Sequence, residues 1–182
     1  MNIALARVQK YLDWIKTKLY LDSTAVKASK RVVKRGEVYF CEFGIGIGSE
    51  QEKVRPCVIL QNDIGNINSP NTIIAPITNS PGTPAVTVEI KNQYNYNNGN
   101  DQLTGYILLG NIITVSKARL GDNIAILLDE MNEIDDKILV SLSLFKQFKK
   151  LKDTIQTDKA FIPIPRLHLL LGGVSTFLLQ WG

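Results

Sequence analysis

The residue best suited to chemistry in this sequence is Arg55, which follows the charged stretch Gly48–Lys53 and precedes Pro56. A guanidinium stays charged in essentially any site and offers paired N–H donors, so its natural role is a bidentate phosphate clamp. The apolar run Cys57–Leu60 predicts a buried strand, and a proline at its start helps to fix the direction of Arg55. The alternative is a surface salt-bridge arginine followed by a strand-start proline.

Catalytic signatures that need other residue types are missing. The single histidine, His168, lies in an apolar C-terminal stretch, and a Ser-His-Asp or Cys-His centre would depend on it alone. Cys41 and Cys57 are far apart in apolar runs, a pattern that gives neither a zinc site nor a disulfide framework. The run Gly44–Gly48 lacks the lysine and the following helix of a phosphate-binding loop, and it predicts a flexible connection between strands. We therefore expect no metal and no cofactor.

One reaction needs little more than an arginine with a hydroxyl group nearby. When RNA is cleaved by attack of its own 2′-hydroxyl group, the substrate supplies the nucleophile. The protein must hold the phosphate, stabilise the charge of the transition state and assist proton transfer. Composition leaves this reaction open without establishing it, because a net charge of +4 is compatible with nucleic acid but is common among soluble proteins.

The elements that must position these residues begin with an amphipathic helix over residues 3–20. Its apolar residues follow three-four spacing, with Tyr11 and Trp14 beside them: Leu5, Val8, Leu12, Ile15 and Leu19. The stripe lasts only about two heptads, so we expect a helix packed on the main domain rather than a partner or dimer helix. Basic residues then crowd together at Lys27, Lys30, Arg31, Lys34 and Arg35. We interpret them as a solvated linker, with phosphate contact as the alternative.

From Gly36 onward the period changes to that of short strands. Five runs fit this pattern: Val38–Phe43, Cys57–Leu60, Thr72–Ile77, Ala85–Ile90 and Tyr106–Leu109. Turn-rich pieces separate them at residues 62–66, 79–82 and 95–100. Strands and helices do not alternate, so the pattern favours a small barrel or half-open sheet over a parallel doubly wound sheet. Residues 134–151 return to helical spacing, with one apolar face formed by Ile134, Ile138, Leu142, Phe145 and Phe148.

The C-terminal stretch Leu167–Trp181 is strongly apolar but shorter than the roughly 20 residues of a spanning helix. We expect a tail packed on the main domain, or an oligomer contact, rather than a membrane anchor. A length of 182 residues, 45% of them hydrophobic, fits one globular domain with extensions. Charged residues interrupt the predicted N-terminal helix, so its sequence is not typical of a signal peptide. We expect a reduced, cytoplasmic environment.

Several segments, in order and spacing, resemble the MazF/PemK toxin family. They are Lys34–Tyr39, Gly48–Gln51, Val54–Pro56, Val58–Asp63, Ser69–Pro70, Thr72–Thr78, Leu108–Leu109 and Thr114–Leu120. The resemblance covers about residues 34–150. It implies three parts: an N-terminal helix and basic linker over 1–33, a toxin-like domain over 34–152, and an apolar tail over 153–182. The implied fold is mainly β with α, namely a small SH3-like β-barrel with a C-terminal helix and an added N-terminal helix.

The resemblance also implies an activity: a sequence-specific, metal-independent endoribonuclease of a toxin–antitoxin pair. Such an enzyme cleaves single-stranded RNA, mainly mRNA, to 2′,3′-cyclic phosphate and 5′-hydroxyl ends. It is usually a homodimer in the cytoplasm, held inactive by an antitoxin, with no membrane partner. Arg55 matches the family's catalytic arginine, in the loop before the second strand, and Thr78 its catalytic threonine. Glu50 is the candidate acceptor of the 2′-hydroxyl proton, or a residue that orders the loop, and Ser49, Gln51, Asn79 and Asn111 are expected to contact RNA.

Other readings of the same residues stay open. Thr78 alone is typical of a turn residue before residues 79–82. The family commonly has Gly-Gly where this chain has Glu52-Lys53, and the segment Gly110–Ile113 also departs from the family pattern. That departure leaves room for a non-catalytic module of the same fold that binds a protein target such as DNA gyrase. A weaker hypothesis is a membrane-associated toxin that uses the apolar tail.

Overall fold

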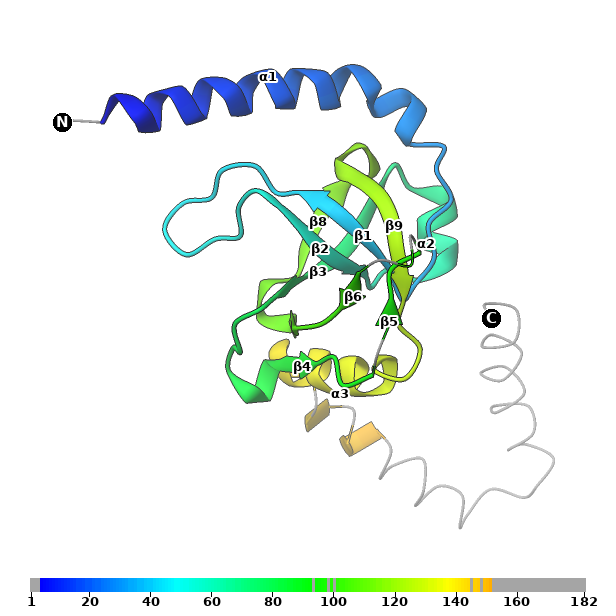
Figure 1. Cartoon of the computed structure of the whole chain (residues 1–182). Coiled ribbons are helices and arrows are strands. Elements are labelled where there is room, and N and C mark those ends of the chain that lie inside the picture. The colour runs from blue at the N-terminus through cyan, green and yellow to red at the C-terminus, as the bar shows by residue number, and fades with distance from the viewer. Residues whose placement is uncertain are drawn as a thin grey trace, which may run out of the picture. The chain divides into compact units, whose positions relative to one another are not determined.

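The computed structural model describes residues 4–92, 94–97, 99, 101–144, 146–147 and 149–151. The chain divides into two compact units, residues 1–138 and 139–182, and the sheet and the candidate site belong to the first. Strands dominate this unit, and helices precede and follow them (Figure 1). The helices and strands are α1 (Leu5–Ala28), β1 (Glu37–Glu42), β2 (Val54–Ile59), α2 (Asp63–Asn68), β3 (Asn71–Thr78), β4 (Thr87–Glu89), β5 (Tyr94–Asn95), β6 (Gln102–Leu103), β7 (Tyr106–Leu108), β8 (Ile113–Ser116), β9 (Leu120–Ile126) and α3 (Met131–Ser141).

The main sheet has the strand order β4-β7-β3-β2-β1-β9, and β8 pairs with β3 beside it. Every described pairing is antiparallel, and β5 and β6 form a separate two-stranded ribbon. The predicted mainly β class is therefore confirmed, as is the prediction against a parallel doubly wound sheet. β2 lies between β1 and β3 at the centre of the order, so the strand that carries Arg55 has support on both edges.

Side chains alternate between the two faces of the sheet, and each face buries its own apolar cluster. Ile134 of α3 belongs to one cluster, which includes Val38, Val58, Leu60, Ala75, Ile77, Val88, Ile107 and Leu127. The other cluster consists of Val33, Tyr39, Cys41, Cys57, Ile59, Ile74, Val115 and Leu120. The face that carries Cys41 and Cys57 is also the face of Arg55, because Arg55 lies two residues before Cys57 in β2.

The predictions were partly wrong where a short helical turn replaces the predicted strand or turn. The predicted strand Ala85–Ile90 begins only at Thr87, because Pro84–Val86 form a 3-10 turn in which the Val86 N–H bonds the Thr83 carbonyl at 3.0 Å. The turn predicted at residues 62–66 is the start of α2, where the Asn62 side chain accepts from the Gly65 N–H at 2.7 Å. β8 and β9, which follow the last predicted strand, were not predicted.

The terminal helices also differ from their predictions. α1 extends to Ala28 rather than residue 20, and it packs on the sheet unit through the 3-10 turn η3 (Lys117–Arg119), as expected for a packed helix. α3 ends at Ser141, whereas the predicted helix ran to residue 151 without a break; residues 146–147 and 149–151 are again helical. Ser143 adopts a φ of +56°, a left-handed conformation that interrupts a helix. The predicted face residues Phe145 and Phe148 lie outside the described residues.

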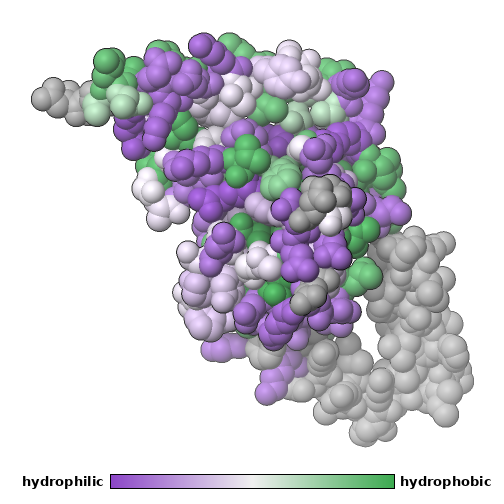
Figure 2. All heavy atoms as spheres, in the orientation of Figure 1, coloured by the Kyte–Doolittle hydropathy of each residue, from purple (hydrophilic) through white to green (hydrophobic). Residues whose placement is uncertain are grey.

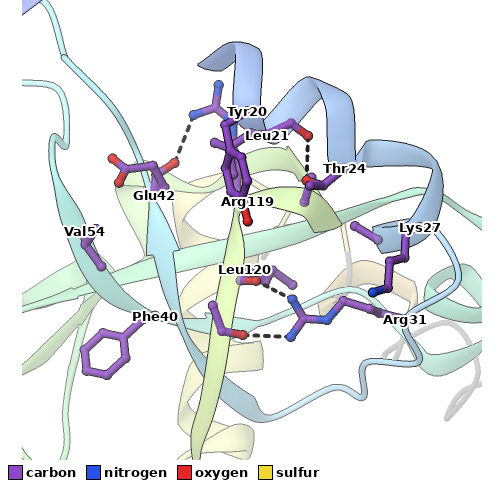
Figure 3. Close-up of a pocket in the computed structure, with 13 residues that line it drawn as sticks. Tyr20, Leu21, Thr24, Lys27, Arg31, Phe40, Glu42, Val54, Arg119 and Leu120 are labelled. Carbon is purple, nitrogen blue, oxygen red and sulfur yellow. Dashed lines mark hydrogen bonds between the residues drawn. The ribbon is translucent and has the colours of Figure 1, made fainter. Parts of the chain in front are cut away.

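The basic segment after α1 is only partly a solvated linker. Lys27, Lys30 and Lys34 are exposed, but Arg31 donates to the carbonyls of Leu120 and Gly121 (Figure 3). Arg35 donates to the Leu60 carbonyl and to the Asp135 carboxylate. The prediction of a solvated linker is therefore wrong for Arg31 and Arg35. Each guanidinium offers several N–H donors in a planar fork and so can bind backbone carbonyls of the folded unit.

Lys117 also links the segment after α1 to the sheet unit through hydrogen bonds. Its side chain is fully buried, and its ammonium donates to the carbonyls of Arg31 at 2.9 Å and Asn66. Burial lowers the pKa of Lys117.

Among the described helices, none combines the length and the apolar character that crossing a membrane requires. The apolar stretch Leu167–Trp181, for which the sequence predicts a packed tail or an oligomer contact, lies outside the described residues.

Candidate active site

Arg55 lies inside β2, not in the loop before it. The prediction placed the strand start at Cys57, but β2 begins at Val54 because β1 continues to pair with it, with Cys41 opposite Arg55. The side chain is half-buried, and its Nε donates to the Glu52 carbonyl at 2.9 Å. That bond fixes the plane of the guanidinium and leaves its terminal amino groups as the available bidentate donors.

Thr78 ends β3, the strand next to β2. Cys57 pairs with Pro76, and extending this antiparallel register by two residues brings Arg55 opposite Thr78. A step of two residues returns to the same face of a strand, so both side chains project from one face of the sheet. The Thr78 hydroxyl donates to the Ser80 carbonyl at 2.9 Å and accepts from the Ser80 N–H at 3.2 Å. It therefore caps the turn that follows β3, and its position is held by that turn.

The loop between β1 and β2 is closed at its base by backbone hydrogen bonds. The Phe43 N–H bonds the Lys53 carbonyl at 2.9 Å, and the Lys53 N–H bonds the Gly44 carbonyl at 2.7 Å. Lys53 makes this closure with a φ of +66°, a conformation that costs a residue with a side chain about 1–2 kcal/mol. Glycine adopts that conformation freely, which gives a physical reason for the usual glycine pair of the resembled family at Glu52-Lys53.

The tip of the same loop carries three of the candidate residues. Ser49 is exposed, and the Glu50 carboxylate accepts from the Ile47 N–H at 2.9 Å, so Glu50 orders the loop in this structure. Gln51 and Glu50 line a pocket of about 280 Å³ together with Asn111 and the backbone segments beside it. The Gln51 Oε1 atom is buried there without a hydrogen-bond partner among the described residues. The structure thus brings Glu50, Gln51 and Asn111 together around one cavity.

Asn79 occupies a different place. It follows Thr78 directly at the exposed end of β3, beside Gly105 of the adjoining turn. Gly105 has a φ of +119°, and a Cβ there would lie 2.4 Å from the Thr78 carbonyl oxygen. This close approach of two backbones requires glycine, and it fixes the chain where the candidate threonine and asparagine stand.

Two residues that shape the site were not predicted as site residues, namely Trp14 of α1 and Arg119 of η3. The Arg119 guanidinium donates to the carbonyls of Glu42 at 3.0 Å and Phe43 at 3.3 Å, where the loop begins. The same guanidinium lies 5.3 Å from the centre of the Trp14 ring. Figure 3 shows the Arg119–Glu42 bond and the pocket between α1 and β9 that surrounds it. In the sequence Arg119 appears only within Thr114–Leu120, a segment that resembles the toxin family, and nothing local there indicates its long-range partners.

α1 therefore lies next to the β1–β2 loop and lines a groove with it. A groove of about 600 Å³ separates the first half of α1 from Glu42, Gly44, Ile45, Glu52 and Lys53. Ile45 lines both this groove and the pocket of Glu50 and Gln51, so the loop borders the α1 groove on one side and carries two candidate residues on the other.

The remaining groups near Arg55 do not offer a second chemistry. Cys41 and Cys57 are fully buried beneath it, and a hydrogen bond with Cys41, together with burial, raises the pKa of the Cys57 thiol well above its usual range. A neutral buried thiol is a poor nucleophile. No group of three or more His, Cys, Asp or Glu side chains is placed to hold a metal ion in the described part of the chain. The extended strand register instead places a guanidinium and a hydroxyl on one face of the sheet, and both groups can bind phosphate.

Residues 34–142 match the family described as "PemK-like, MazF-like toxin of type II toxin-antitoxin system". A relative, "Endoribonuclease EndoA" of Bacillus subtilis (strain 168), is 40% identical over 117 residues. That alignment covers 62% of this chain and 97% of the relative. The family match begins at residue 34, so α1 lies outside it.

Solved structures show a similar fold. "Endoribonuclease in complex with its cognate antitoxin from Mycobacterial species" is 27% identical, with a TM-score of 0.50 over 62% of this chain and 96% of that one. MazF from Deinococcus radiodurans is 17% identical, with a TM-score of 0.52 over 62% of this chain and 98% of that one. At that identity the second likeness concerns the fold alone.

Proposed function

Because the chain belongs to the PemK-like, MazF-like toxin family of type II toxin–antitoxin systems, we propose that it is a sequence-specific endoribonuclease acting on single-stranded RNA. The observation that supports this most is the placement of Arg55 and Thr78 on one face of the sheet, at the ends of adjacent strands. The 40% identical relative carries the name of an endoribonuclease, which supports the same activity.

In the proposed reaction the 2′-oxygen of RNA bonds to the adjacent phosphorus, and the bond from phosphorus to the 5′-oxygen breaks. The products are a 2′,3′-cyclic phosphate and a 5′-hydroxyl group, with one proton leaving the 2′-oxygen and one reaching the 5′-oxygen. Neither step needs a metal ion or a covalent protein intermediate, because the attacking oxygen belongs to the substrate.

Arg55 takes the central role in this proposal. Its terminal amino groups bind the non-bridging phosphate oxygens, where negative charge grows in the transition state. The bond from Nε to the Glu52 carbonyl holds the guanidinium in place before substrate arrives, so little ordering is left for the reaction itself. Thr78 positions the same phosphate by hydrogen bonding, which requires its hydroxyl to exchange the Ser80 carbonyl for a phosphate oxygen.

Recognition of the RNA sequence is assigned to the polar groups around the loop. Gln51 and Asn111 line one pocket, and amide side chains can pair with the edges of unstacked bases. The buried, unpartnered Oε1 of Gln51 is an acceptor that a base amino group would satisfy. Ser49 and Asn79 are exposed at the two sides of the site and complete the proposed contact set.

The finer features of the fold and assembly belong to the same proposal. We place the toxin domain at residues 34–152, with its sheet closed as a small SH3-like barrel, between an N-terminal helix segment and a C-terminal tail. We also propose a homodimer that acts on mRNA in the cytoplasm and is neutralised by a cognate antitoxin. The mycobacterial structure, solved with its cognate antitoxin, supports the last point.

The test is cleavage of a long single-stranded RNA in the presence of EDTA, followed by analysis of the product ends. The proposal predicts cuts at one short recurring sequence, with 2′,3′-cyclic phosphate and 5′-hydroxyl ends. Growth inhibition without any RNA cleavage would instead support a protein-binding toxin of the same fold. We do not favour that alternative, because the relative that is 40% identical is an endoribonuclease by name.

A further inference from the structure

α1 turns a mixed face of apolar and polar residues toward the sheet unit. The half-buried residues of α1 recur at helical spacing: Trp14, Thr17, Leu21, Thr24, Ala25 and Ala28. The predicted apolar stripe is a different set, about half a turn of the helix away. None of the stripe residues is half-buried, and α1 has no fully buried residue, so the stripe contributes little to holding α1 on the unit.

All five stripe residues are exposed, although Ile15 and Leu19 also line a groove of about 370 Å³ with Ser116, Ala118 and Arg119. The exposed fractions are 83% for Leu5, 39% for Val8, 49% for Leu12, 50% for Ile15 and 66% for Leu19. Figure 2 shows apolar side chains at the outer edge of α1 among hydrophilic ones. Single exposed apolar residues are ordinary on a protein surface, but five in one row on one helix face form a contiguous patch of the kind that marks a binding site.

The spacing of the stripe indicates which kind of secondary structure would bind to it. Its residues alternate at intervals of three and four, which is the seam that one helix offers to another in knobs-into-holes packing. The seam is narrow, because Lys16 and Ser23 lie along one edge and Asp22 continues the three-four series after Leu19. A helix that lies in a membrane interface needs a broad apolar face, so this seam fits a partner helix better than a bilayer.

The charges beside the seam identify the chemistry of that helix. Lys16 and Lys18 flank it in the positions that face a partner's flanking residues, and residues 1–35 contain nine basic and two acidic side chains. The one ion pair of the helix that the described residues show, from Lys16 to Asp13 at 3.8 Å, is exposed on both sides and so contributes little. A second copy of α1 would bring no carboxylate to these flanking positions, whereas a helix with carboxylates at its edges would complement the lysines.

We propose that the outer face of α1 docks an amphipathic helix of a partner protein, one whose apolar seam is flanked by glutamates or aspartates. The site lies outside the residues that match the toxin family, and it does not depend on the proposed nuclease activity. The partner would lie across α1 from the β1–β2 loop, because Trp14 occupies the side that faces Gly44.

The test uses a fluorescent synthetic helix of about three heptads, with leucine at its seam positions and glutamate at its edges. Binding to the full chain is measured by fluorescence anisotropy. Replacing Leu12 and Leu19 together by alanine should weaken binding about tenfold or more, because both are proposed seam contacts. The matched control is Leu128→Ala, a residue that is 73% exposed but lies outside α1, and this change should leave affinity unaltered.

A charge exchange keeps the test independent of helix stability. In Lys16→Glu/Lys18→Glu the acidic probe should bind more weakly, and a probe with lysine at its edges should gain affinity. Unchanged affinity in both sets of variants would overturn the proposal. So would stripe-dependent self-association of the chain without probe, or stripe-dependent binding to anionic vesicles, since either would assign the face to a different occupant.

Discussion

The indole ring of Trp14 lies directly on Gly44, so that a Cβ at Gly44 would come within 2.3 Å of the Trp14 Cζ2 atom. The contact joins a helix outside the matched family region to the first residues of the loop that carries Ser49, Glu50 and Gln51. Gly44 is itself held at a φ of +83°, and Arg119 fastens the residues just before it. The conformation of the proposed RNA-reading loop is thus coupled to α1.

Gly44→Ala should therefore destabilise the protein more than Gly48→Ala. Both glycines have positive φ, but nothing lies within 4 Å of a Cβ at Gly48, so that variant carries only backbone strain of about 1–2 kcal/mol. Urea unfolding of each variant measures the difference. When Gly44→Ala is made in a Trp14→Ala background, its additional loss of stability relative to Gly48→Ala should largely disappear, because the clash is removed. Equal costs for the two single variants would show that Trp14 does not rest on Gly44.

Lys53→Gly should raise the free energy of unfolding by about 1 kcal/mol, since Lys53 holds a left-handed conformation that glycine adopts without strain. Glu52→Gly is the matched control, because Glu52 is not among the residues with positive φ. There the added chain entropy of glycine should lower stability by about 0.5–1 kcal/mol. Opposite signs from adjacent residues are the expected result, and a stabilising effect at both positions would contradict it.

The pH dependence of stability should include a contribution from Glu133. A hydrogen bond from Lys137 lowers the pKa of Glu133 below its usual 4.5, and Lys137 also donates to the Thr87 carbonyl at 2.6 Å. The folded state favours the charged carboxylate, so this contribution is present above the unfolded pKa and is lost as pH falls through the folded value. Urea midpoints of wild type and Glu133→Gln should differ at pH 7 and converge in acid. A constant difference at all pH values would contradict this assignment.

Glu50 has two proposed roles that one pair of variants separates. Its carboxylate accepts from the Ile47 N–H, and Glu50→Gln keeps an acceptor oxygen for that bond but cannot accept a proton from the 2′-hydroxyl group. Because the Glu50 carboxylate stabilises the loop through the Ile47 N–H, we expect Glu50→Gln to keep its cleavage rate within a few-fold. Glu50→Ala should lose more of the cleavage rate. A loss of about 100-fold or more in Glu50→Gln, with unchanged stability, would assign it the proton-transfer role.

The sequence was sufficient for features that local chemistry determines. Alternating apolar runs located β1, β3 and β7 closely, whereas the apolar run Cys57–Leu60 located β2 but missed its first three residues, Arg55 among them. Residues whose position depends on distant partners were not predictable in this way. Arg119 bonds carbonyls that lie more than 70 positions away, and Trp14 packs on a glycine from another element. Lys53 was noticed only as a departure from a family pattern, because sequence does not reveal the sign of φ at a residue with a side chain.

The outer stripe of α1 illustrates the same limit. Three-four spacing correctly predicted a packed helix, but it did not reveal that the packed face is the one with Trp14 and Thr17 rather than the one with Leu12 and Leu19. A periodic apolar stripe normally faces the core, since burial of apolar surface drives packing. Here a stacked indole and a bonded guanidinium fix the helix through the opposite face.

The central claim is that Arg55 stabilises the charge of a phosphate during RNA cleavage. The most direct measurement is the single-turnover rate on a single-stranded RNA in EDTA, for wild type, Arg55→Ala, Arg55→Lys and the charge-matched surface control Lys91→Ala. Thermal unfolding confirms that each variant is folded. We predict a loss of at least ~100-fold in Arg55→Ala, incomplete rescue by lysine because it lacks the paired donors, and a wild-type rate for Lys91→Ala. A folded Arg55→Ala variant that cleaves at the wild-type rate would contradict the account.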